Sequence, residues 1–523
     1  MTSTLQSRSL RWEDVAAACL ILLIAVLIVV YAIGRHYLNV NTETDFISGF
    51  QPEAARFLAG ERLLLEFHPP GYPVALATLQ PAVGDWFAAG LFISALAAIA
   101  VLVSSYACFR ELFGPCAGLG ALAALAGSAV FMEYSVQATS DVYFLALWTL
   151  ALWLVVLAMR QQRVWQWCLA GLLIAGAVLS RTNGVVLLML LIAPLISGHT
   201  LRAGARNCAV LTVAVAGPLL LWLYYARSVG SPFMPTQTHA NLALTYFADG
   251  SRISADSLVL LRSQFTSSLD VVLADPQRVA RIYLHDLMGL PGKLLRRMTW
   301  PPLAALSLVC AVAWLAKLKD RRALLVLALT LGSVALLNMK AFEARYFLLL
   351  VPVAGASIGM AAAWLAGRFE HVERATRAAA VGLTALTALA FAAAGYAGFA
   401  RAEEPALTAE FREIVAAIED NAPDNALIVC RKCNAAYHSG RANAGFFPDV
   451  QDLRQLCGYL ESLDRDRPTY LVIATMERKL RPEISTALLS DPLPSWLEVT
   501  AEGTGSAPWR LIRYRNGTSC RGQ

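Results

Sequence analysis

The feature that most constrains this chain is an uncharged apolar run close to its start, from Val15 to Ile33. A helix of that length, rising about 1.5 Å per residue, crosses a hydrocarbon core of about 30 Å. The run lacks a small-residue cleavage site after a short core, so we expect an uncleaved first helix rather than a signal peptide. The chain is therefore expected to begin as a membrane-spanning helix.

Similar apolar runs follow along most of the chain. Of its 523 residues, 57% are hydrophobic and 15% are charged, whereas about a quarter of residues are charged in typical soluble domains. These runs predict an all-α polytopic membrane protein with about eleven spanning helices. They lie near residues 15–33, 86–109, 116–132, 142–159, 165–180, 184–197, 208–226, 301–316, 323–338, 347–366 and 378–400.

The positions of Arg and Lys predict how these helices are oriented. If there are eleven helices, Arg and Lys are concentrated in every second gap, that is, in every second segment between apolar runs. Such a concentration of positive charge is typical of cytoplasmic loops. The N-terminus is then expected in the cytoplasm and the tail after Arg401 outside it. The net charge of +6 reflects topology rather than nucleic-acid binding. The charged gaps contain Arg8 and Arg11, Arg110, Arg160 and Arg163, Arg202 and Arg206, Lys317 to Arg322, and Arg368 to Arg377.

The composition changes after residue 400 and predicts a second domain. We expect a transmembrane domain over residues 1–400, with outer loops at 35–85 and 227–300, and a small α/β domain over residues 401–523. In the latter, amphipathic helices are predicted at residues 408–421 and 450–463. Buried strands are predicted at residues 426–430, 470–474 and 509–515.

The first outer loop combines acids with a predicted surface helix. Glu43 and Asp45 come shortly after the first apolar run. From Phe46 to Leu58 the apolar residues recur at helical spacing, which indicates a helix lying on the membrane and ending at Gly60. The following HPPGYP turns the chain back toward the bilayer, because proline cannot donate a backbone hydrogen bond.

Four of the ten cysteines fall in the polar tail. Cys430 and Cys433 form an isolated CxxC, which is compatible with a redox pair, half of a metal site or a disulfide. In an oxidising outer compartment we favour a structural disulfide involving Cys457. The fourth cysteine of the tail is Cys520.

Several common motifs are absent from the sequence. It has no P-loop, HExxH or GxSxG pattern, and its seven histidines lack metal-ligand spacing. ATP-driven transport and zinc hydrolysis are disfavoured. Most charges lie at helix ends rather than at mid-membrane, which argues against a secondary transporter and for a site at the outer surface. No metal ligand set is predicted, although a divalent cation held by carboxylates is left open.

An enzyme at the outer surface can act on a lipid whose head group is in water, such as a polyprenyl-phosphate sugar. Sugar transfer requires a carboxylate to accept the proton of the acceptor hydroxyl, and cations to bind the departing phosphate. Asp45 is the first candidate for the base and Glu43 the second. The candidates for phosphate contact are Arg181, Arg345, Arg296 and Arg297, because Arg forms paired hydrogen bonds with phosphate.

Taken together, the order of motifs resembles a known class. After the acidic first loop and its surface helix come HPPGYP, SDVYFLALWTLALWL, GLLIAGAVLSRTNGVVLL and, near Arg345, ARYFLLLVP. This order is similar to that of polyprenol-phosphate-sugar-dependent glycosyltransferases of the GT-C class, such as protein O-mannosyltransferases and bacterial lipid A aminoarabinose transferases. The resemblance covers about the first 200 residues and resumes near Arg345.

The resemblance implies roles for individual residues. Asp45 occupies the position of the catalytic acid in the first outer loop, and Asp141 that of the acid opening the fourth helix. Arg345, followed by Tyr346, matches a basic residue that faces the lipid phosphate. Family members often carry Lys where this chain has His68 and, in the later turn, Arg181. Inversion at the anomeric carbon is the implied stereochemistry.

Each candidate also has a purely structural explanation. Asp45 and Asp141 could each cap the helix that follows. Arg345 and Tyr346 could anchor a helix at the interface, and Arg181 could simply join two helices. For His68 the structural explanation is favoured.

The sequence as a whole predicts a bacterial inner-membrane glycosyltransferase that uses a polyprenyl-phosphate sugar donor on the extracytoplasmic side. The acceptor is a lipid, glycan or protein, and neither it nor the sugar can be read from the sequence. The alternatives are an O-antigen ligase or polymerase and a non-catalytic transporter or assembly protein.

Overall fold

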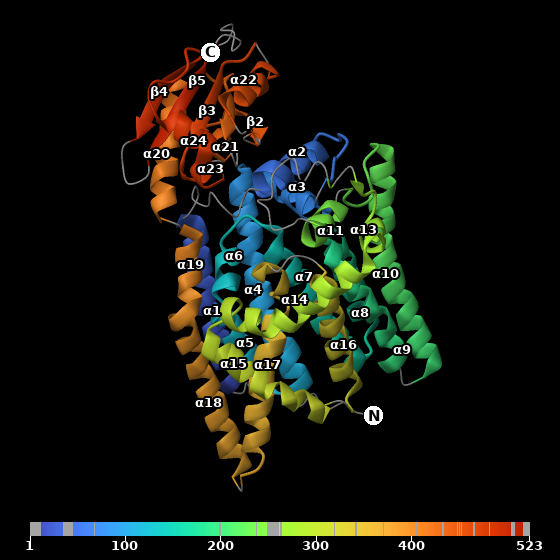
Figure 1. Ribbon diagram of the computed structural model, residues 1–523. Coiled ribbons are helices and arrows are strands. Elements are labelled where there is room, and N and C mark those ends of the chain that lie inside the picture. Colours follow the sequence, from blue (N-terminus) through green and yellow to red (C-terminus); the bar gives the residue numbers. More distant parts are fainter. Residues whose placement is uncertain are drawn as a thin grey trace. The chain divides into compact units, whose positions relative to one another are not determined.

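The chain is represented by a computed structural model (Figure 1). It describes residues 12–34, 45–66, 68–197, 200–236, 238–247, 261, 264–317, 319–339, 343–369, 371–403, 405–430, 434–446, 448, 450, 452–463, 466–480, 482–503 and 508–515. The chain divides into two compact units. Unit 1 comprises Met1–His36, Glu53–Tyr246 and Ser268–Ala402, and unit 2 comprises Tyr37–Pro52, Phe247–Ser267 and Glu403–Gln523.

Every apolar run predicted from the sequence is helical in the structure. Seven runs correspond to α1 (Trp12–Gly34), α4 (Trp86–Phe113), α7 (Ser140–Gln161), α8 (Val164–Ser180), α10 (Leu201–Ser228), α16 (Arg321–Leu337) and α17 (Leu350–Ala366). The other four are divided into α5 (Pro115–Ala126) with α6 (Ala129–Ser135), η2 (Thr182–Ile192) with α9 (Ala193–Ser197), α15 (Pro301–Cys310) with η3 (Ala311–Lys317), and α18 (Val372–Ala390) with η5 (Phe391–Gly395) and α19 (Tyr396–Glu403).

The chain is an integral membrane protein, but the expected count of about eleven spans is not confirmed. Among the described residues, five helices are long and apolar enough to cross a membrane, or six if the bent pair α5 and α6 forms one span. That pair bends by 72°. Four further apolar segments are shorter, at 10–17 residues each.

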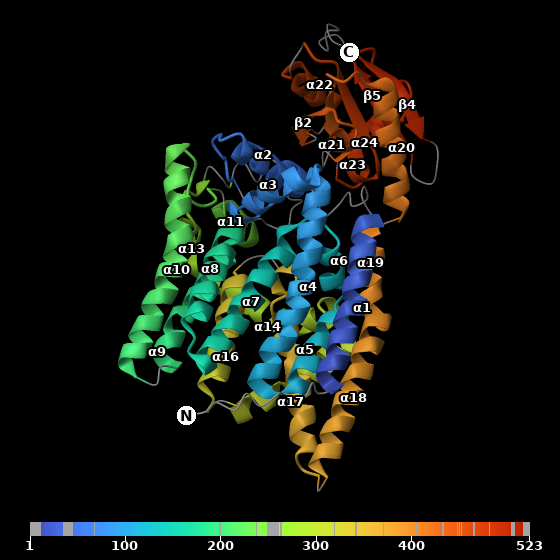
Figure 2. The ribbon, with the colours of Figure 1, turned by 180° about the vertical axis from the view of Figure 1, so that it is seen from behind.

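Helices that are too short or too polar to span connect these elements in unit 1. They are α2 (Gln51–Leu58), α3 (Gly71–Val83), α11 (Thr238–Phe247), α13 (Ser268–Ala274) and α14 (Pro276–Arg297). The sequence analysis did not predict α3. The first residue of α3 approaches α8 closely, because a Cβ at Gly71 would lie 2.6 Å from Ser180 Oγ. Figure 2 shows the helices from the opposite side.

The central helix contact in unit 1 depends on small residues. Helices α5 and α17 pack so closely that a Cβ at Gly355 would lie 2.3 Å from the carbonyl oxygen of Gly120. A Cβ at Gly359 would lie 1.9 Å from that of Cys116. Small residues allow such approach between membrane helices. This contact positions α17 and therefore the short 3₁₀ helix η4 (Ala344–Phe347) that precedes it.

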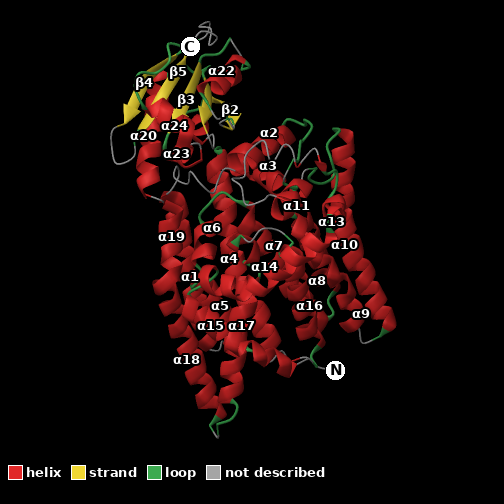
Figure 3. Cartoon of the chain, in the orientation of Figure 1, coloured by secondary structure: helices red, strands yellow, loops and turns green. Residues whose placement is uncertain are grey.

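Unit 2 contains the predicted α/β domain, whose strands are yellow in Figure 3. The strands are β1 (Leu427–Cys430), β2 (Ala442–Phe446), β3 (Thr469–Ile473), β4 (Leu497–Gly503) and β5 (Trp509–Tyr514), in the order β2-β1-β3-β5-β4. β1 pairs in parallel with β2 and β3, and β5 pairs antiparallel with β3 and β4. The helices are α20 (Pro405–Asn421), α21 (Asn434–His438), α22 (Leu453–Glu461), α23 (Thr475–Leu480) and α24 (Pro482–Leu489).

Two hydrophobic cores cover the two faces of this sheet. One includes Phe411 and Ile418 of α20, and the other Leu456 and Leu460 of α22. Cys457 is disulfide-bonded, which confirms the disulfide predicted there, whereas Cys430 is a reduced thiol. The sequence therefore predicted α20, α22 and three strands, but not α21, α23, α24, β2 or β4.

The segment after Asp45 is helical, as expected, but its environment differs from the prediction. It begins as the π-helix η1 (Phe46–Phe50) and continues as α2, and Gly60 follows with a left-handed φ of 69°. The side chains of Phe46, Phe50 and Ala54 are at most 2% exposed. These three side chains are therefore buried within protein rather than lying on the membrane, whereas Leu58 of the same predicted face is 48% exposed.

Candidate functional site

A polar cluster in unit 1 is built by the ends of three helical segments. Asp141 lies in the first turn of α7, and Arg181 directly follows the last residue of α8. Arg345 and Tyr346 belong to η4, ahead of α17. At Arg181 the backbone becomes extended, with φ −151° and ψ 142°, so α8 ends there.

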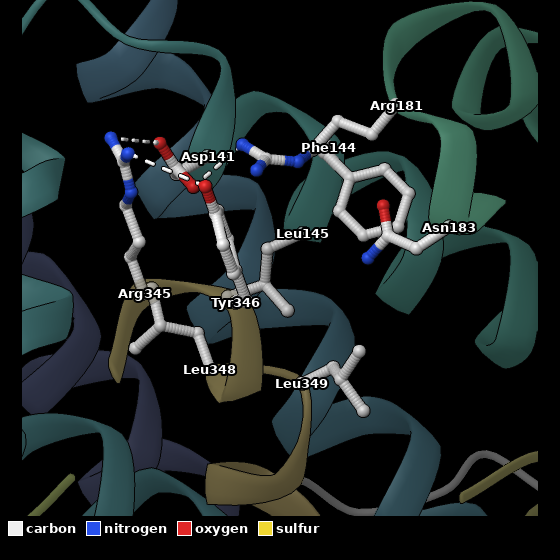
Figure 4. A pocket seen from close by; sticks show the side chains of 9 residues that line it. All are labelled: Asp141, Phe144, Leu145, Arg181, Asn183, Arg345, Tyr346, Leu348 and Leu349. Carbon is white, nitrogen blue, oxygen red and sulfur yellow. Dashed lines mark hydrogen bonds and ion pairs between the residues drawn. The ribbon is translucent and has the colours of Figure 1, made fainter. Parts of the chain in front are cut away.

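The carboxylate of Asp141 lies between two guanidinium groups (Figure 4). Nη1 of Arg181 donates to Oδ1 at 2.6 Å, and Nη1 of Arg345 lies 3.8 Å from Oδ2. The Asp141 side chain is only 4% exposed, and those of the arginines are 20% and 18% exposed. A buried carboxylate needs such partners, since an unpaired buried charge is strongly destabilising.

The ring of Tyr346 contacts both arginines. Its centroid lies 5.0 Å from Cζ of Arg181 and 5.2 Å from Cζ of Arg345. Tyr134 of α6 adds a second ring, 5.9 Å from Cζ of Arg345. Cations are attracted to aromatic faces at these distances. The two guanidinium groups are therefore placed by one shared carboxylate and one shared ring.

Glu343 also pairs with Arg345, whose Nε lies 2.6 Å from Oε2. Burial alone would lower the pKa of the Arg345 guanidinium, but the charge of Asp141, with contributions from Tyr346 and Glu343, raises that pKa above its usual value. Burial likewise raises the pKa of Tyr346. Arg345 is therefore a permanent cation beside a neutral phenol.

A pocket opens beside these groups and has a polar and an apolar side. It is small: the space not filled by atoms is about 230 Å³ with open solvent included, and only about 10 Å³ of it admits the centre of a water molecule. The polar lining is formed by Asp141, Arg181, Asn183, Arg345 and Tyr346, and the apolar lining by Phe144, Leu145, Leu348 and Leu349. Two cations next to leucine and phenylalanine side chains suit an anionic group attached to an apolar chain.

Comparisons with known proteins identify one matching family and several solved structures of similar fold. Residues 67–225 match the family described as dolichyl-phosphate-mannose-protein mannosyltransferase. The fold is similar to that of ArnT from Cupriavidus metallidurans, solved both bound to undecaprenyl phosphate and in the apo state. The TM-scores are 0.55 and 0.56 at 13% identity, and the matches cover 94% and 95% of this chain and 97% and 98% of ArnT.

The fold is also similar to that of the Archaeoglobus fulgidus oligosaccharyltransferase in complex with Zn and sulfate. The TM-score is 0.52 at 13% identity, over 87% of this chain and 68% of that one. No curated protein sequence matches the chain significantly. At 13% identity these likenesses show the fold of the chain. The expected GT-C fold, with a small C-terminal α/β domain, is thereby confirmed.

The structure rules out the two capping explanations. Asp45 directly precedes η1 with helical φ and ψ of −63° and −28°, and its side chain makes no capping hydrogen bond. The residue at the cap of α7 is Thr139, whereas the Asp141 carboxylate pairs with Arg181. Asp45 belongs to unit 2, whereas the cluster around Asp141 belongs to unit 1.

The other predicted residues do not line this pocket. His68 is partly buried in the turn before α3, and Arg296 and Arg297 end α14 with exposed side chains. Glu43 lies outside the described residues.

Two residues of the cluster were missed by the sequence analysis. Glu343 precedes Arg345 by two positions, a spacing that could have suggested the ion pair. Tyr134 gave no such signal, because its contact depends on how α6 packs against η4.

The described residues were also considered as ligands of a divalent cation. None of their His, Cys, Asp and Glu side chains form a group of three that could hold a metal ion. The two carboxylates of the cluster, Asp141 and Glu343, already pair with arginines.

Proposed function

We propose that this protein is a glycosyltransferase of the GT-C class, which transfers a sugar from a polyprenyl-phosphate donor to an acceptor at the extracytoplasmic face of a bacterial inner membrane. The observation that carries the proposal is the pair of arginines on Asp141, next to an apolar wall, in a fold similar to that of ArnT bound to undecaprenyl phosphate. The sugar and the acceptor, which is a lipid, glycan or protein, are left open.

In this proposal Arg181 and Arg345 bind the donor phosphate. Guanidinium groups form paired, charge-assisted hydrogen bonds with phosphate oxygens and stabilise the charge that develops as the phosphate departs. Asp141 orients both arginines rather than acting on the sugar, because its carboxylate is already paired. Asp141 is therefore proposed as a positioning residue, in place of the catalytic role that the family resemblance implies. His68, Arg296 and Arg297 are further candidates for phosphate contact.

Asp45 is proposed as the general base. Its carboxylate takes the proton of an acceptor hydroxyl while the hydroxyl oxygen bonds to the anomeric carbon. The bond from that carbon to the phosphate oxygen breaks, and its electron pair leaves with the polyprenyl phosphate, which inverts the anomeric centre. Support comes from the place of Asp45 in the first outer loop, directly before the π-helix η1. Glu43 is the second candidate.

The proposed orientation places the N-terminus in the cytoplasm and the C-terminal domain outside. The alternating positive gaps support it. The disulfide of Cys457 supports it independently, since disulfides persist mainly in oxidising compartments.

The test is transfer of label from polyprenyl-phosphate sugars to extracted envelope components by the purified protein. Asp45→Asn should abolish transfer without changing the unfolding temperature. Arg345→Lys should raise the donor KM about tenfold, because Lys retains the charge but not the fork that pairs with phosphate. Arg377→Lys is the matched control, since Arg377 forms an exposed pair with Glu373. If folded protein transfers no label from any donor, the proposal fails.

A further inference from the structure

Four aromatic rings form a continuous series within unit 2. Phe46 of η1 meets Tyr437 of α21 edge to face, with centroids 6.5 Å apart and planes at 89°. Tyr437 meets His438 at 5.2 Å and 87°, and His438 meets Phe411 of α20 at 5.5 Å and 84°. Edge-to-face contacts at such distances are favourable in addition to the area they bury.

One end of this series is anchored in the domain core. Phe411 is 5% exposed and belongs to the core that α20 forms against the sheet. The turn after α21 is bound to the end of α20, because Nε and Nη2 of Arg441 donate to the carbonyl oxygen of Ala422 at 3.1 and 3.0 Å. The position of Tyr437 is thus determined by the folded domain.

The other end of the series, Phe46, is next to the proposed base in the sequence. Phe46 is fully buried and directly follows Asp45. η1 is a π-helix, a conformation that is rare and appears mostly as single turns at functional sites. Such a turn depends on tertiary contacts, and the contact of Phe46 with Tyr437 supplies one.

We propose that the C-terminal domain is part of the catalytic machinery, because Tyr437 is a positioning residue that places the Asp45 segment through Phe46. The inference rests on the proposed role of Asp45 as general base. A misplacement of about 1 Å can cost about 100-fold in rate. Loosening η1 should therefore lower kcat while leaving binding of the donor phosphate, assigned to the arginines of unit 1, unchanged.

The test compares Tyr437→Leu with Tyr437→Phe and with a matched control, Tyr514→Leu. Tyr514 forms a similar edge-on pair with Trp496, at 6.2 Å and 71°, in the other core of the same domain. Hydrogen exchange of residues 46–50 in the full-length protein reports on η1 without requiring activity. Transfer kinetics report kcat and the donor KM.

We expect Tyr437→Leu to speed exchange in η1 and to lower kcat about tenfold or more, with less than a twofold change in KM. Tyr437→Phe retains the aromatic ring, so exchange in η1 and kcat should both stay at the values of the parent protein. Tyr514→Leu should also change neither the exchange of η1 nor kcat. Unchanged exchange in Tyr437→Leu overturns the proposal. Faster exchange in Tyr437→Leu together with an unchanged kcat also overturns the proposal, provided that Asp45→Asn is inactive. If Asp45→Asn is fully active, the base assignment is what fails, whatever the exchange data.

Discussion

Asp141 and Arg181 form a buried ion pair across 40 positions of sequence, with 2.6 Å between Oδ1 and Nη1. The pair joins the first turn of α7 to the end of α8. Because the second oxygen of the same carboxylate faces Arg345, one acid determines the spacing of two cations.

Asp141→Asn should therefore both destabilise the protein and weaken donor binding. Two partly buried guanidinium groups lose their shared counter-ion, at a cost of about 3 kcal/mol. We expect a lower unfolding temperature in detergent and a donor KM raised about tenfold or more. Glu373→Gln is the control, since its exposed i,i+4 pair contributes about 0.5 kcal/mol or less. Unchanged stability and an unchanged donor KM would show that Asp141 does not orient the two arginines.

Glu343→Gln should have the opposite effect on the donor. The Glu343 carboxylate forms an ion pair with Nε of Arg345, and its side chain is 48% exposed. It therefore competes with an incoming phosphate for this donor. Removal of its charge should lower the donor KM about threefold, the size expected for an exposed ion pair. Titration of transfer rate against donor concentration measures this. An increase in KM would mean that Glu343 orients Arg345 for the phosphate instead of competing with it.

The sequence predicted where helices form but not how they bend. Hydropathy alone identified all eleven helical runs, because burial in lipid or protein requires apolar residues along their whole length. The break between α5 and α6 was missed because it depends on a distant contact. Ser128 accepts from the backbone N–H of Phe131 and also donates to the carbonyl oxygen of Met298, 170 positions away.

For the site, the sequence predicted the individual residues but not how they come together. The resemblance identified Asp141, Arg181 and Arg345 one by one, as members of separate motifs. Their convergence on one carboxylate follows from the packing of α7, α8 and α17, which no local pattern encodes. Phe46 was misinterpreted for the same reason, since an apolar residue at helical spacing suits a membrane surface and a protein core equally well.

The disulfide of Cys457 gives a prediction about thiol labelling. The seven other described cysteines are reduced thiols. The protein is denatured with or without a reductant and is then alkylated with a thiol-reactive polymer. The sample without reductant should carry two fewer labels than the reduced sample. Equal labelling before and after reduction would argue against an oxidising environment for this domain.

Glu53 gives a prediction for pH dependence. Burial raises the pKa of its carboxyl above the ordinary 4.5, although the bond from the Leu64 N–H opposes the shift. The folded protein therefore binds this proton more tightly than the unfolded chain, and stability declines as the pH rises through the raised pKa. Glu53→Gln retains an acceptor but cannot titrate. The unfolding temperature of the variant minus that of the parent should increase between pH 4 and pH 7, and a difference that decreases would contradict the assigned shift.

Gly359→Ala should disrupt the contact between α5 and α17. The added methyl would lie 1.9 Å from the Cys116 carbonyl oxygen and 2.4 Å from its carbon, so whole helices must separate rather than one side chain. Overpacking of this kind costs about 3 kcal/mol. Since α17 follows η4, its displacement also moves Arg345, and we expect a raised donor KM in the protein that remains folded.

The matched control for this substitution is Gly382→Ala in α18. A Cβ at Gly382 meets no atom within 4 Å, and replacing Gly by Ala inside a helix stabilises it by about 0.5 to 1 kcal/mol. Thermal unfolding in detergent and transfer kinetics should therefore separate the two variants in opposite directions. Equal unfolding temperatures would mean that α5 and α17 do not pack this closely, and the placement of Arg345 by α17 would lose its structural basis.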